Sequence, residues 1–315
     1  MSLCCKQTST KLLFVFLIVL CSCSLSHKHE TDSATKISQN KPVYFVSVPF
    51  TKLSPIRSPC LDVEIEGKTF STELDLGLRG DIAIEKEFID QISLKTLIGT
   101  TPMYGIRGKE YPTNFYRIPK IQIGVMHFNQ PILQEKSQEF VKDGTFIQSG
   151  RERSPRDPVR LGWSLFYDVN LLVDVKNFEI AFCDSLDTLK KRGYPIEAFT
   201  KCPLDLERGL VEFEAETPKG KLRCMLDTGT TCNMFNSEIA EGETVEQMIW
   251  EPENWLNYNF FKIEGNDFGP ITFRRVPIHI PIRIEAVIGM EFIEDHLIFI
   301  DFANKLIYFA KNTDN

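Results

Sequence analysis

Polar and apolar residues alternate along two segments of the chain, and both segments end at an aspartate. The first spans 63–75 and the second 211–227. Alternation of this kind has the period of a half-buried β-strand. Each segment is interrupted by a turn that contains glycine, Gly67 in the first and Gly220 in the second. The pattern therefore predicts two β-hairpins of the same layout, each leading into an aspartate.

The chain also contains an internal repeat. Residues 161–182 and 288–309 share their apolar pattern at a constant offset of 127 positions. Five residues are identical at that offset, the pairs being Gly162/Gly289, Asp168/Asp295, Asp174/Asp301, Asn177/Asn304 and Phe182/Phe309. One aspartate hairpin precedes each copy. The sequence thus predicts two related lobes in one chain, 42–200 and 201–315.

The two lobes are expected to differ in size and to contain short helices. The interval from Asp75 to Gly162 is longer than the interval from Asp227 to Gly289. Apolar spacing predicts short helices over 86–92 and 245–249, after the two aspartates.

Composition and charge exclude several functions. The chain has 315 residues, of which 43% are hydrophobic and 25% charged, an ordinary globular balance. A formal net charge of −7 offers no broad basic surface, so no nucleic-acid partner is expected. The five histidines and the cysteines form no recognisable metal-binding or nucleotide-binding motif, so we expect neither a metal nor another cofactor.

The N-terminus has the features of an export signal. Lys6 and Lys11 precede an apolar run over 12–20, which is too short to span a membrane and has the length of a signal-peptide core. The following Leu-Cys-Ser-Cys resembles a bacterial lipobox and points to lipidation at Cys23. We expect a signal peptide over 1–22 and a polar tether over 23–41. The protein is then exported and anchored to a cell-envelope membrane through lipid; a plain cleaved signal and secretion is the alternative.

The aspartate segments resemble the active-site loops of the pepsin/retropepsin group of aspartic proteases. The motifs are Asp75-Leu76-Gly77 and Asp227-Thr228-Gly229, with Thr230 following the second. Each lobe also contains a strand ending in a hydrophobic residue and glycine, at Gly162 and Gly289, against which the aspartate loop packs in that family. The resemblance implies an all-β fold of two pseudo-symmetric lobes with a cleft between them. Because both loops lie in one chain, we expect a monomer.

The resemblance also implies a chemistry and a substrate class. Two carboxylates in contact cannot both ionise easily, so the pair holds one proton. The ionised member acts as general base on a water molecule, while the protonated member assists the scissile carbonyl and the leaving amine. Asp75 and Asp227 are the expected catalytic residues of an endopeptidase that hydrolyses peptide or protein substrates.

The first loop departs from the family pattern. Leu76 replaces the threonine that, in the family, hydrogen-bonds across to the opposite loop, and Leu78 replaces a residue that is often Ser or Thr. Thr228 and Thr230 keep both hydroxyls in the second loop. The alternative function is therefore a weak or inactive relative that binds extended peptides by β-augmentation.

Two further segments are candidates for roles near the substrate. Tyr104, Gly105 and Gly108 resemble the tip of a flap, although Tyr104 also suits a hairpin aromatic packed on its neighbours. Residues 264–269 are expected to take the equivalent place in the second lobe. The mixed-charge segment 151–160 and Arg79 are interpreted as solvated loop residues.

Five cysteines follow Cys23, namely Cys60, Cys183, Cys202, Cys224 and Cys232. An odd number permits two disulfides at most and leaves one thiol. Cys224 and Cys232 flank the second aspartate loop, but spacing does not decide whether they pair. The alternative is that the cysteines are buried thiols.

Overall fold

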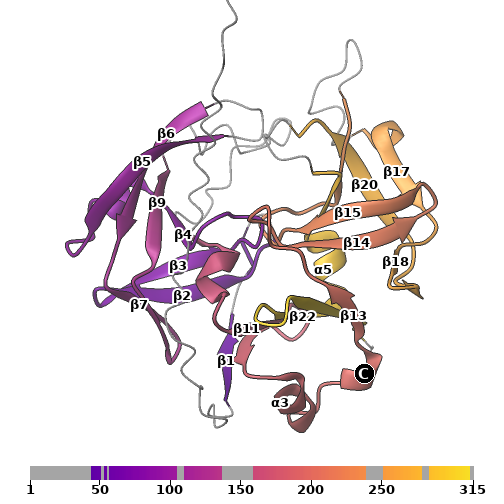
Figure 1. Ribbon diagram of the computed structural model, residues 1–315, viewed down its shortest axis with the longest axis horizontal. Coiled ribbons are helices and arrows are strands. Elements are labelled where there is room, and N and C mark those ends of the chain that lie inside the picture. The colour runs from indigo at the N-terminus through magenta and orange to yellow at the C-terminus, as the bar shows by residue number, and fades with distance from the viewer. Residues whose placement is uncertain are drawn as a thin grey trace, which may run out of the picture. The chain divides into compact units, whose positions relative to one another are not determined.

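The strands within the described residues form three β-sheets (Figure 1). The structure is a computed structural model and describes residues 44–50, 53–54, 57–104, 110–136, 159–238, 251–278 and 284–312. Several predictions lie outside the described residues: the signal peptide predicted over 1–22, the tether predicted over 23–41 with Cys23, the flap residues Gly105 and Gly108, residues 151–158 of the predicted loop, and the helix predicted over 245–249. Among the residues described, no helix is both long and apolar enough to cross a membrane.

The first lobe is built on a nine-stranded sheet with the strand order β5-β6-β9-β4-β10-β3-β2-β7-β8. Its strands are β2 (Cys60–Ile65), β3 (Lys68–Leu74), β4 (Ile82–Glu85), β5 (Thr96–Tyr104), β6 (Glu110–Arg117), β7 (Lys120–Ile123), β8 (Met126–Asn129), β9 (Ile132–Lys136) and β10 (Val159–Leu161). Helix α1 (Lys86–Ile89) follows β4, so the predicted first helix is present but shorter than expected.

The second lobe is built on an eight-stranded sheet with the order β17-β20-β16-β21-β15-β14-β18-β19. Its strands are β14 (Glu212–Thr217), β15 (Gly220–Leu226), β16 (Met234–Asn236), β17 (Trp255–Tyr258), β18 (Lys262–Ile263), β19 (Asn266–Asp267), β20 (Ile271–Val276) and β21 (Ala286–Ile288). Short helices in the described part of this lobe include η3 (Pro252–Asn254) and α5 (Met290–Ile293).

The two sheets repeat one pairing scheme. In the first, β10 lies between a parallel partner, β3, and an antiparallel one, β4. In the second, β21 lies in the same way between β15 and β16. The next strands, β9 and β20, are each parallel to their neighbours β4 and β16. The all-β fold with two pseudo-symmetric lobes is therefore confirmed.

The same scheme corrects one expectation. Residues 264–269 form the turn and outer strand of the β18–β19 hairpin, which pairs with β14 at one edge of its sheet. The hairpin in this position of the first lobe is β7–β8, which pairs with β2. The candidate flap lies at the opposite edge, in β5 and β6. Residues 264–269 are thus not the counterpart of the flap.

A third, six-stranded sheet combines strands from both halves of the chain in the order β1-β12-β11-β22-β23-β13. The strands are β1 (Phe45–Pro49), β11 (Asn170–Asp174), β12 (Glu179–Cys183), β13 (Thr200–Pro203), β22 (His296–Asp301) and β23 (Leu306–Lys311). Short helices η1 (Trp163–Phe166), α3 (Leu186–Lys191) and η2 (Ile196–Ala198) accompany it. The sheet joins the lobes because β11 pairs with β22.

The structure explains why the repeated residues are identical in this sheet. Asp174 accepts hydrogen bonds from the backbone and side-chain amides of Asn177, at 3.1 and 2.8 Å. Asp301 accepts the same two bonds from Asn304, at 3.0 and 2.7 Å. Each aspartate thereby closes the turn of a hairpin, β11–β12 or β22–β23. Two of the repeated pairs, Asp174/Asp301 and Asn177/Asn304, therefore form equivalent turns.

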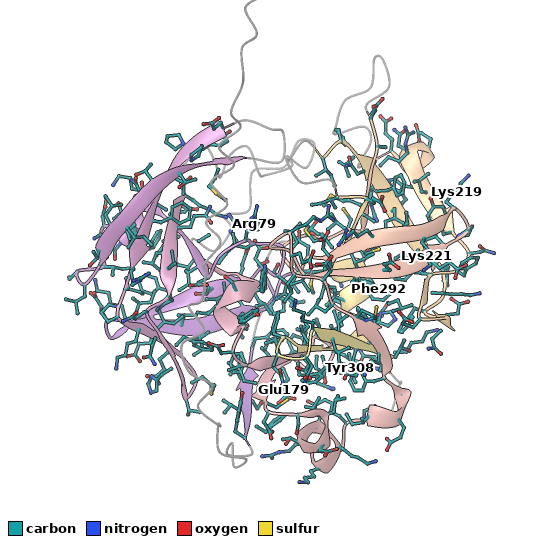
Figure 2. The ribbon with its side chains drawn as sticks, viewed as in Figure 1. Arg79, Glu179, Lys219, Lys221, Phe292 and Tyr308 are labelled. Carbon is teal, nitrogen blue, oxygen red and sulfur yellow. The ribbon has the colours of Figure 1, made fainter. Side chains whose placement is uncertain are left out.

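Apolar side chains from all three sheets form one continuous core. Figure 2 draws the side chains of the described residues on the ribbon. Leu74, Leu161, Leu226 and Ile288, which end the strands around the two aspartate loops, are completely buried in this core. Burial of this extent holds the strand ends in fixed positions, at roughly 2 kcal/mol for each large side chain. The aspartate loops therefore start from rigid strands.

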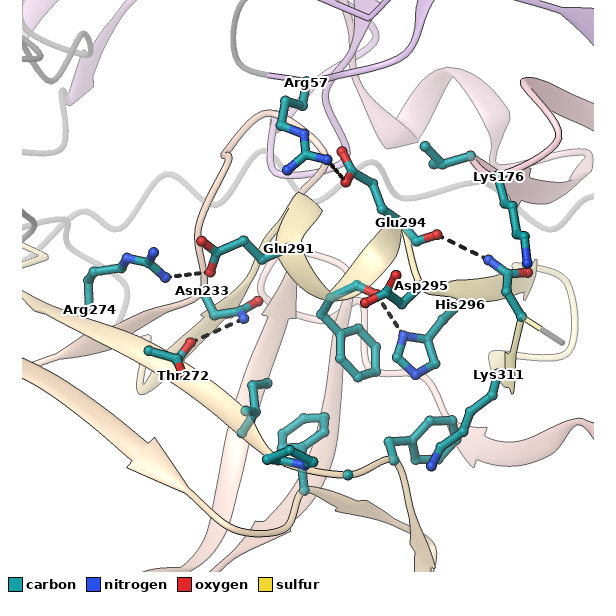
Figure 3. A pocket seen from close by; sticks show the side chains of 18 of the residues that line it. Arg57, Lys176, Asn233, Thr272, Arg274, Glu291, Glu294, Asp295, His296 and Lys311 are labelled. Carbon is teal, nitrogen blue, oxygen red and sulfur yellow. Dashed lines mark hydrogen bonds and ion pairs between the residues drawn. The ribbon is translucent and has the colours of Figure 1, made fainter. Parts of the chain in front are cut away.

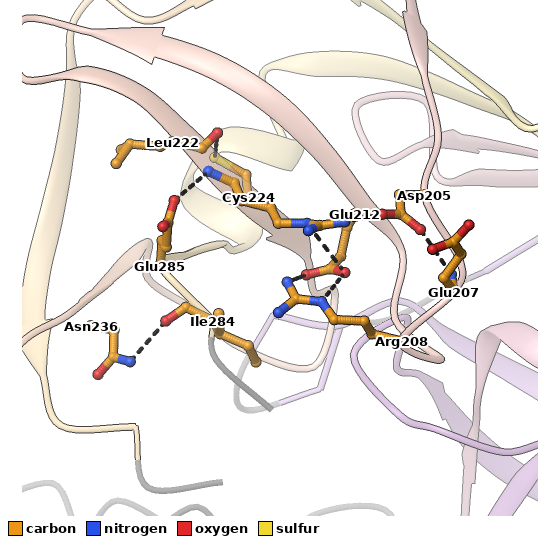
Figure 4. A network of polar contacts seen from close by, with 10 residues as sticks. Asp205, Glu207, Arg208, Glu212, Leu222, Cys224, Asn236, Ile284 and Glu285 are labelled. Carbon is orange, nitrogen blue, oxygen red and sulfur yellow. Dashed lines mark hydrogen bonds and ion pairs between the residues drawn. The ribbon is translucent and has the colours of Figure 1, made fainter. Parts of the chain in front are cut away.

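One buried carboxylate in the second lobe is held by two arginines. Glu212, at the start of β14, accepts hydrogen bonds from Arg208 (Figure 4). The Nε atom of Arg223 lies 3.6 Å from the Glu212 carboxylate. Arg223 also pairs with Asp205, which joins the segment before β14 to the hairpin. A buried carboxylate without a partner is costly, and these arginines provide Glu212 with opposite charge where the chain enters the second lobe.

The cysteines are thiols in the described structure. Cys183, Cys202, Cys224 and Cys232 are free, so Cys224 and Cys232 do not form the disulfide that the sequence left open. Cys60 is buried on β2.

Candidate active site

The two aspartate loops leave their hairpins in the same way. The backbone amide of Asp75 donates to the carbonyl of Leu161 at 2.8 Å, and that of Asp227 donates to Ile288 at 2.9 Å. Each bond continues the parallel pairing of the preceding strand, β3 with β10 and β15 with β21. Both aspartates therefore lie at equivalent strand ends of the two pseudo-symmetric sheets.

Each aspartate lies against the glycine of the opposite loop. A Cβ atom built on Gly77 would stand 2.6 and 2.7 Å from the carboxylate oxygens of Asp227. A Cβ atom on Gly229 would stand 2.5 and 2.9 Å from those of Asp75. Real Cβ atoms essentially never come this close to another heavy atom, so a larger residue at either position would have to displace the opposing carboxylate. The loops, 152 positions apart in sequence, thus place both carboxylates in one small site.

The hydroxyl of Thr228 ties the two loops together. It accepts a hydrogen bond from the backbone amide of Leu76 at 3.0 Å and donates one to the carbonyl of Leu74 at 2.6 Å. Leu76 occupies the equivalent place in the first loop and is completely buried in the apolar core. The Ser58 hydroxyl also donates to the carbonyl of Thr228. Ser58, which the sequence did not single out, thus adds a third hydrogen bond between the first lobe and the second loop.

Gly162 and Gly289 lie beneath the loops, where the resemblance implied contact. A Cβ atom on Gly162 would be 2.8 Å from the carbonyl oxygen of Leu78. One on Gly289 would be 2.9 Å from the carbonyl oxygen of Thr230. The amide of Met290, at the start of α5, donates to that same Thr230 oxygen at 2.9 Å. The backbone of each loop therefore packs against a glycine that directly follows a strand, Gly162 after β10 and Gly289 after β21.

Arg160 contacts the first aspartate directly. Its Nη1 atom donates to Oδ2 of Asp75 at 3.2 Å, and both side chains are largely buried, at 13% and 9% exposure. The interpretation of 151–160 as a solvated loop is therefore wrong at Arg160, which belongs to β10. The alternation of β10 buries Val159 and Leu161 on one side and turns Arg160 to the other.

Further charged groups surround Arg160 in the first lobe. In the strand pairing Arg160 stands beside Glu73 of β3, whose side chain is completely buried. On β4, burial and then the neighbouring Glu87 raise the pKa of Glu85, while Arg160 and Lys136 act in the opposite direction. Lys136 of β9 is itself buried and pairs in register with Glu85. Asp75 thus adjoins a cluster of buried charges.

Other predicted residues lie at the margins of the site. Leu78 is buried, and its backbone amide closes a turn by donating to the Asp75 carbonyl at 3.0 Å. The Thr230 hydroxyl interacts with the thiol of Cys232. Arg79 is exposed, as expected, and its guanidinium lies against the backbone at Gly209. Tyr104 ends β5, the edge strand of the first sheet, at the place where the candidate flap begins.

A separate pocket of about 950 Å³ is lined mainly by residues of the second lobe, together with first-lobe residues such as Arg57 and Lys176, and neither aspartate lines it (Figure 3). Aromatic residues and ion pairs line it, including Trp255, Phe268, His296 and the pair Arg274–Glu291. Of the segments predicted from the sequence to lie near the substrate, only 264–269 contributes to this pocket, through Phe268 and Gly269. Within the described part of the chain, no three His, Cys, Asp or Glu side chains are grouped to hold a metal ion.

Comparisons with known proteins give a fold. A scan against models of protein families finds no match, and no curated protein matches the sequence. The structure is similar to that of basic 7S globulin from soybean, with a TM-score of 0.55, 9% identity, and coverage of 86% of this chain and 96% of that one. It is also similar to the aspartic proteinase from Irpex lacteus, with a TM-score of 0.52, 13% identity, and coverage of 86% and 98%. The fold is therefore pepsin-like.

Proposed function

We propose that the protein is an endopeptidase that hydrolyses peptide bonds with a water molecule activated between Asp75 and Asp227. The observation that carries this proposal is the reciprocal packing of each carboxylate against the glycine of the other loop. The Thr228 hydroxyl supports it because it fixes one loop relative to the other. Similarity to an aspartic proteinase in fold agrees with the proposal and by itself assigns no activity.

The reaction uses only the two carboxyl groups and water. The ionised carboxylate removes a proton from the water, whose oxygen forms a bond to the carbonyl carbon of the peptide. The protonated carboxyl group donates its hydrogen bond to the carbonyl oxygen while negative charge develops there. The C–N bond then breaks as the leaving nitrogen receives a proton from the pair. One water molecule is consumed, and the carboxyl pair returns to its single-proton state.

A second candidate is peptide binding without cleavage. Two observations favour it: Asp75 is only 6% exposed, and Arg160 occupies one of its carboxylate oxygens. Leu76 also has no hydroxyl, so the first loop cannot make the hydrogen bonds to the second loop that Thr228 makes to the first. An extended peptide bound between the lobes would then be held by backbone hydrogen bonds and released unchanged.

Cleavage of an unbiased peptide library, from acid to neutral pH, separates the two candidates. We expect the wild-type protein to cleave, and Asp75→Asn and Asp227→Asn each to abolish cleavage. Asp62→Asn is the matched control, since Asp62 is exposed on β2. Cleavage that survives either active-site substitution contradicts the mechanism. Retention of peptides by folded protein without any cleavage supports the binding candidate instead.

The proposed location rests on the sequence alone. We propose export and anchoring of the protein in a cell-envelope membrane through lipid on Cys23. Mass spectrometry of the purified N-terminal peptide is expected to show a diacylglyceryl-type mass increase on Cys23 that is missing in Cys23→Ser. An unmodified N-terminus of a secreted protein would show that the alternative, a plain cleaved signal, is correct.

A further inference from the structure

In the first lobe, Arg160 places a cation beside the catalytic aspartate, and the equivalent position of the second lobe has no charged side chain. Because β10 and β21 occupy equivalent places in the two sheets, Arg160 stands where β21 has Val287. Val287 is buried in an apolar cluster, whereas the guanidinium of Arg160 donates to the carboxylate of Asp75 at 3.2 Å. The two lobes therefore present their aspartates with different electrostatic surroundings at this position.

We propose that Arg160 is a positioning residue that keeps the negative charge of the carboxylate pair on Asp75 and leaves the shared proton to Asp227. The inference rests on the proposed function, because it assumes that both carboxylates act on one water molecule. An arginine is charged at every pH at which the protein folds, and its hydrogen bond to a carboxylate is strongest when that carboxylate is ionised. Asp75 then acts as the general base, and Asp227 as the general acid.

The burial of the pair makes the effect strong. Both side chains are exposed by 13% or less, so solvent and salt screen the Arg160–Asp75 attraction weakly. The contact also fixes the direction of the Asp75 carboxylate in the loop where Leu78 has no hydroxyl to do so. Arg160 thereby supplies from the underlying strand an orientation that the loop sequence does not supply.

Charged groups from each neighbouring element share this environment. Glu73 on β3 lies beside Arg160 in register, and Glu85 on β4 is influenced by both Arg160 and Lys136 of β9. Asp227 approaches from the opposite loop. A variant at Arg160 changes the balance of all these groups, so the test needs substitutions that separate charge from shape.

Arg160→Lys and Arg160→Met form the matched pair for kinetics, because only the first keeps a cation. We expect Arg160→Met to lower kcat about 100-fold with little change in KM, as for a misplaced reacting group. The pH at which its activity is lost on the alkaline side (its alkaline limit) is expected to rise by about one unit, since two carboxylates without the cation keep their shared proton up to a higher pH. Arg160→Lys is expected to keep the wild-type limit. Equal pH profiles for the three proteins would overturn the proposal.

A second measurement does not depend on cleavage. Carboxyl ¹³C resonances of Asp75 and Asp227 in the labelled protein report which group carries the last proton. In the wild type we expect the last proton to reside on Asp227. In Arg160→Met we expect it to be shared between Asp75 and Asp227. A last proton on Asp75 in the wild type overturns the inference, whether or not the protein cleaves peptides. If the wild type cleaves nothing, the proposed function fails while this measurement still decides the role of Arg160.

Arg160→Met removes a cation next to buried Glu73, and its folding is checked by thermal unfolding. If it does not fold, the double variant Arg160→Met/Glu73→Gln removes the neighbouring charge as well and replaces it in both measurements. The double variant is expected to show the same shift in pH limit and the same proton distribution. A wild-type distribution in a folded double variant contradicts the proposal.

Discussion

Gly77 stands directly against the carboxylate of Asp227, so a single methyl group there would lie within 2.6 Å of a carboxylate oxygen. We therefore expect Gly77→Ala to displace Asp227 and to lower the rate of peptide cleavage by at least roughly 100-fold. Gly229→Ala should act in the same way on Asp75. Steady-state kinetics on a peptide identified from the library measures the loss.

Gly99 offers the matched control for these substitutions. It lies on β5, and a Cβ atom there would meet nothing within 4 Å. Gly99→Ala is expected to leave both activity and stability within about 0.5 kcal/mol of the wild type. Wild-type activity in Gly77→Ala would contradict the close approach of the two loops.

Thr228→Val tests the contact between the loops without changing the shape of the side chain. The substitution removes both hydrogen bonds of the hydroxyl and leaves the buried amide of Leu76 without that acceptor. We expect a loss of about 2–4 kcal/mol in the free energy of unfolding, measured by urea titration. Thr228→Ser keeps the hydroxyl and should lose only about 1 kcal/mol. Equal losses in the two variants would show that the hydroxyl contributes nothing.

The residues that meet at this site could be predicted where the chain repeats itself. The aspartates, the glycines that follow them and the supporting Gly162 and Gly289 all stand in duplicated patterns. A repeated pattern predicts which residues meet because equivalent strands end at equivalent positions, and the loops that follow them lie side by side. Leu76 could also be identified as a departure, since Thr228 provides the comparison within the same chain.

Arg160 could not be placed from sequence for the opposite reason. It follows a mixed-charge segment, and its contact with Asp75 depends on the parallel pairing of β10 with β3, which are far apart in sequence. The only signal was that the repeat has an apolar residue, Val287, at the matching position. The misplaced flap counterpart at 264–269 has the same origin, because turn residues identify a hairpin and not the sheet edge to which it belongs.

Thiol reactivity follows from the burial of the cysteines. Burial raises the pKa of Cys232 and of Cys202 to about 11, and that of Cys183 to about 12. Because only the thiolate reacts, we expect iodoacetamide at pH 8 to modify these residues at least roughly 100-fold more slowly in the native protein than in urea. Peptide mass spectrometry over time measures each site. Complete labelling of native protein within minutes would contradict the burial.

His296 provides a pH dependence of stability that a single variant isolates. Its Nδ1 atom lies 2.6 Å from the carbonyl of Phe292, its ring stacks on that residue, and burial lowers its pKa. The unfolded chain therefore binds the proton at higher pH than the folded protein does. The stabilising contribution is complete above pH of about 6.5 and is lost as pH falls through the lower, folded pKa, by about 1.4 kcal/mol for each unit of difference between the unfolded and folded pKa values.

His296→Gln retains an amide that can donate to the carbonyl of Phe292 and removes this titration. We expect the wild type to lose more unfolding free energy than the variant between pH 7.5 and 5.0, measured by urea titration. The buried acids Asp174 and Glu294, whose pKa values burial raises, titrate in both proteins and cancel in the comparison. Parallel pH profiles for the two proteins would show that His296 takes up its proton equally well in the folded and unfolded chain.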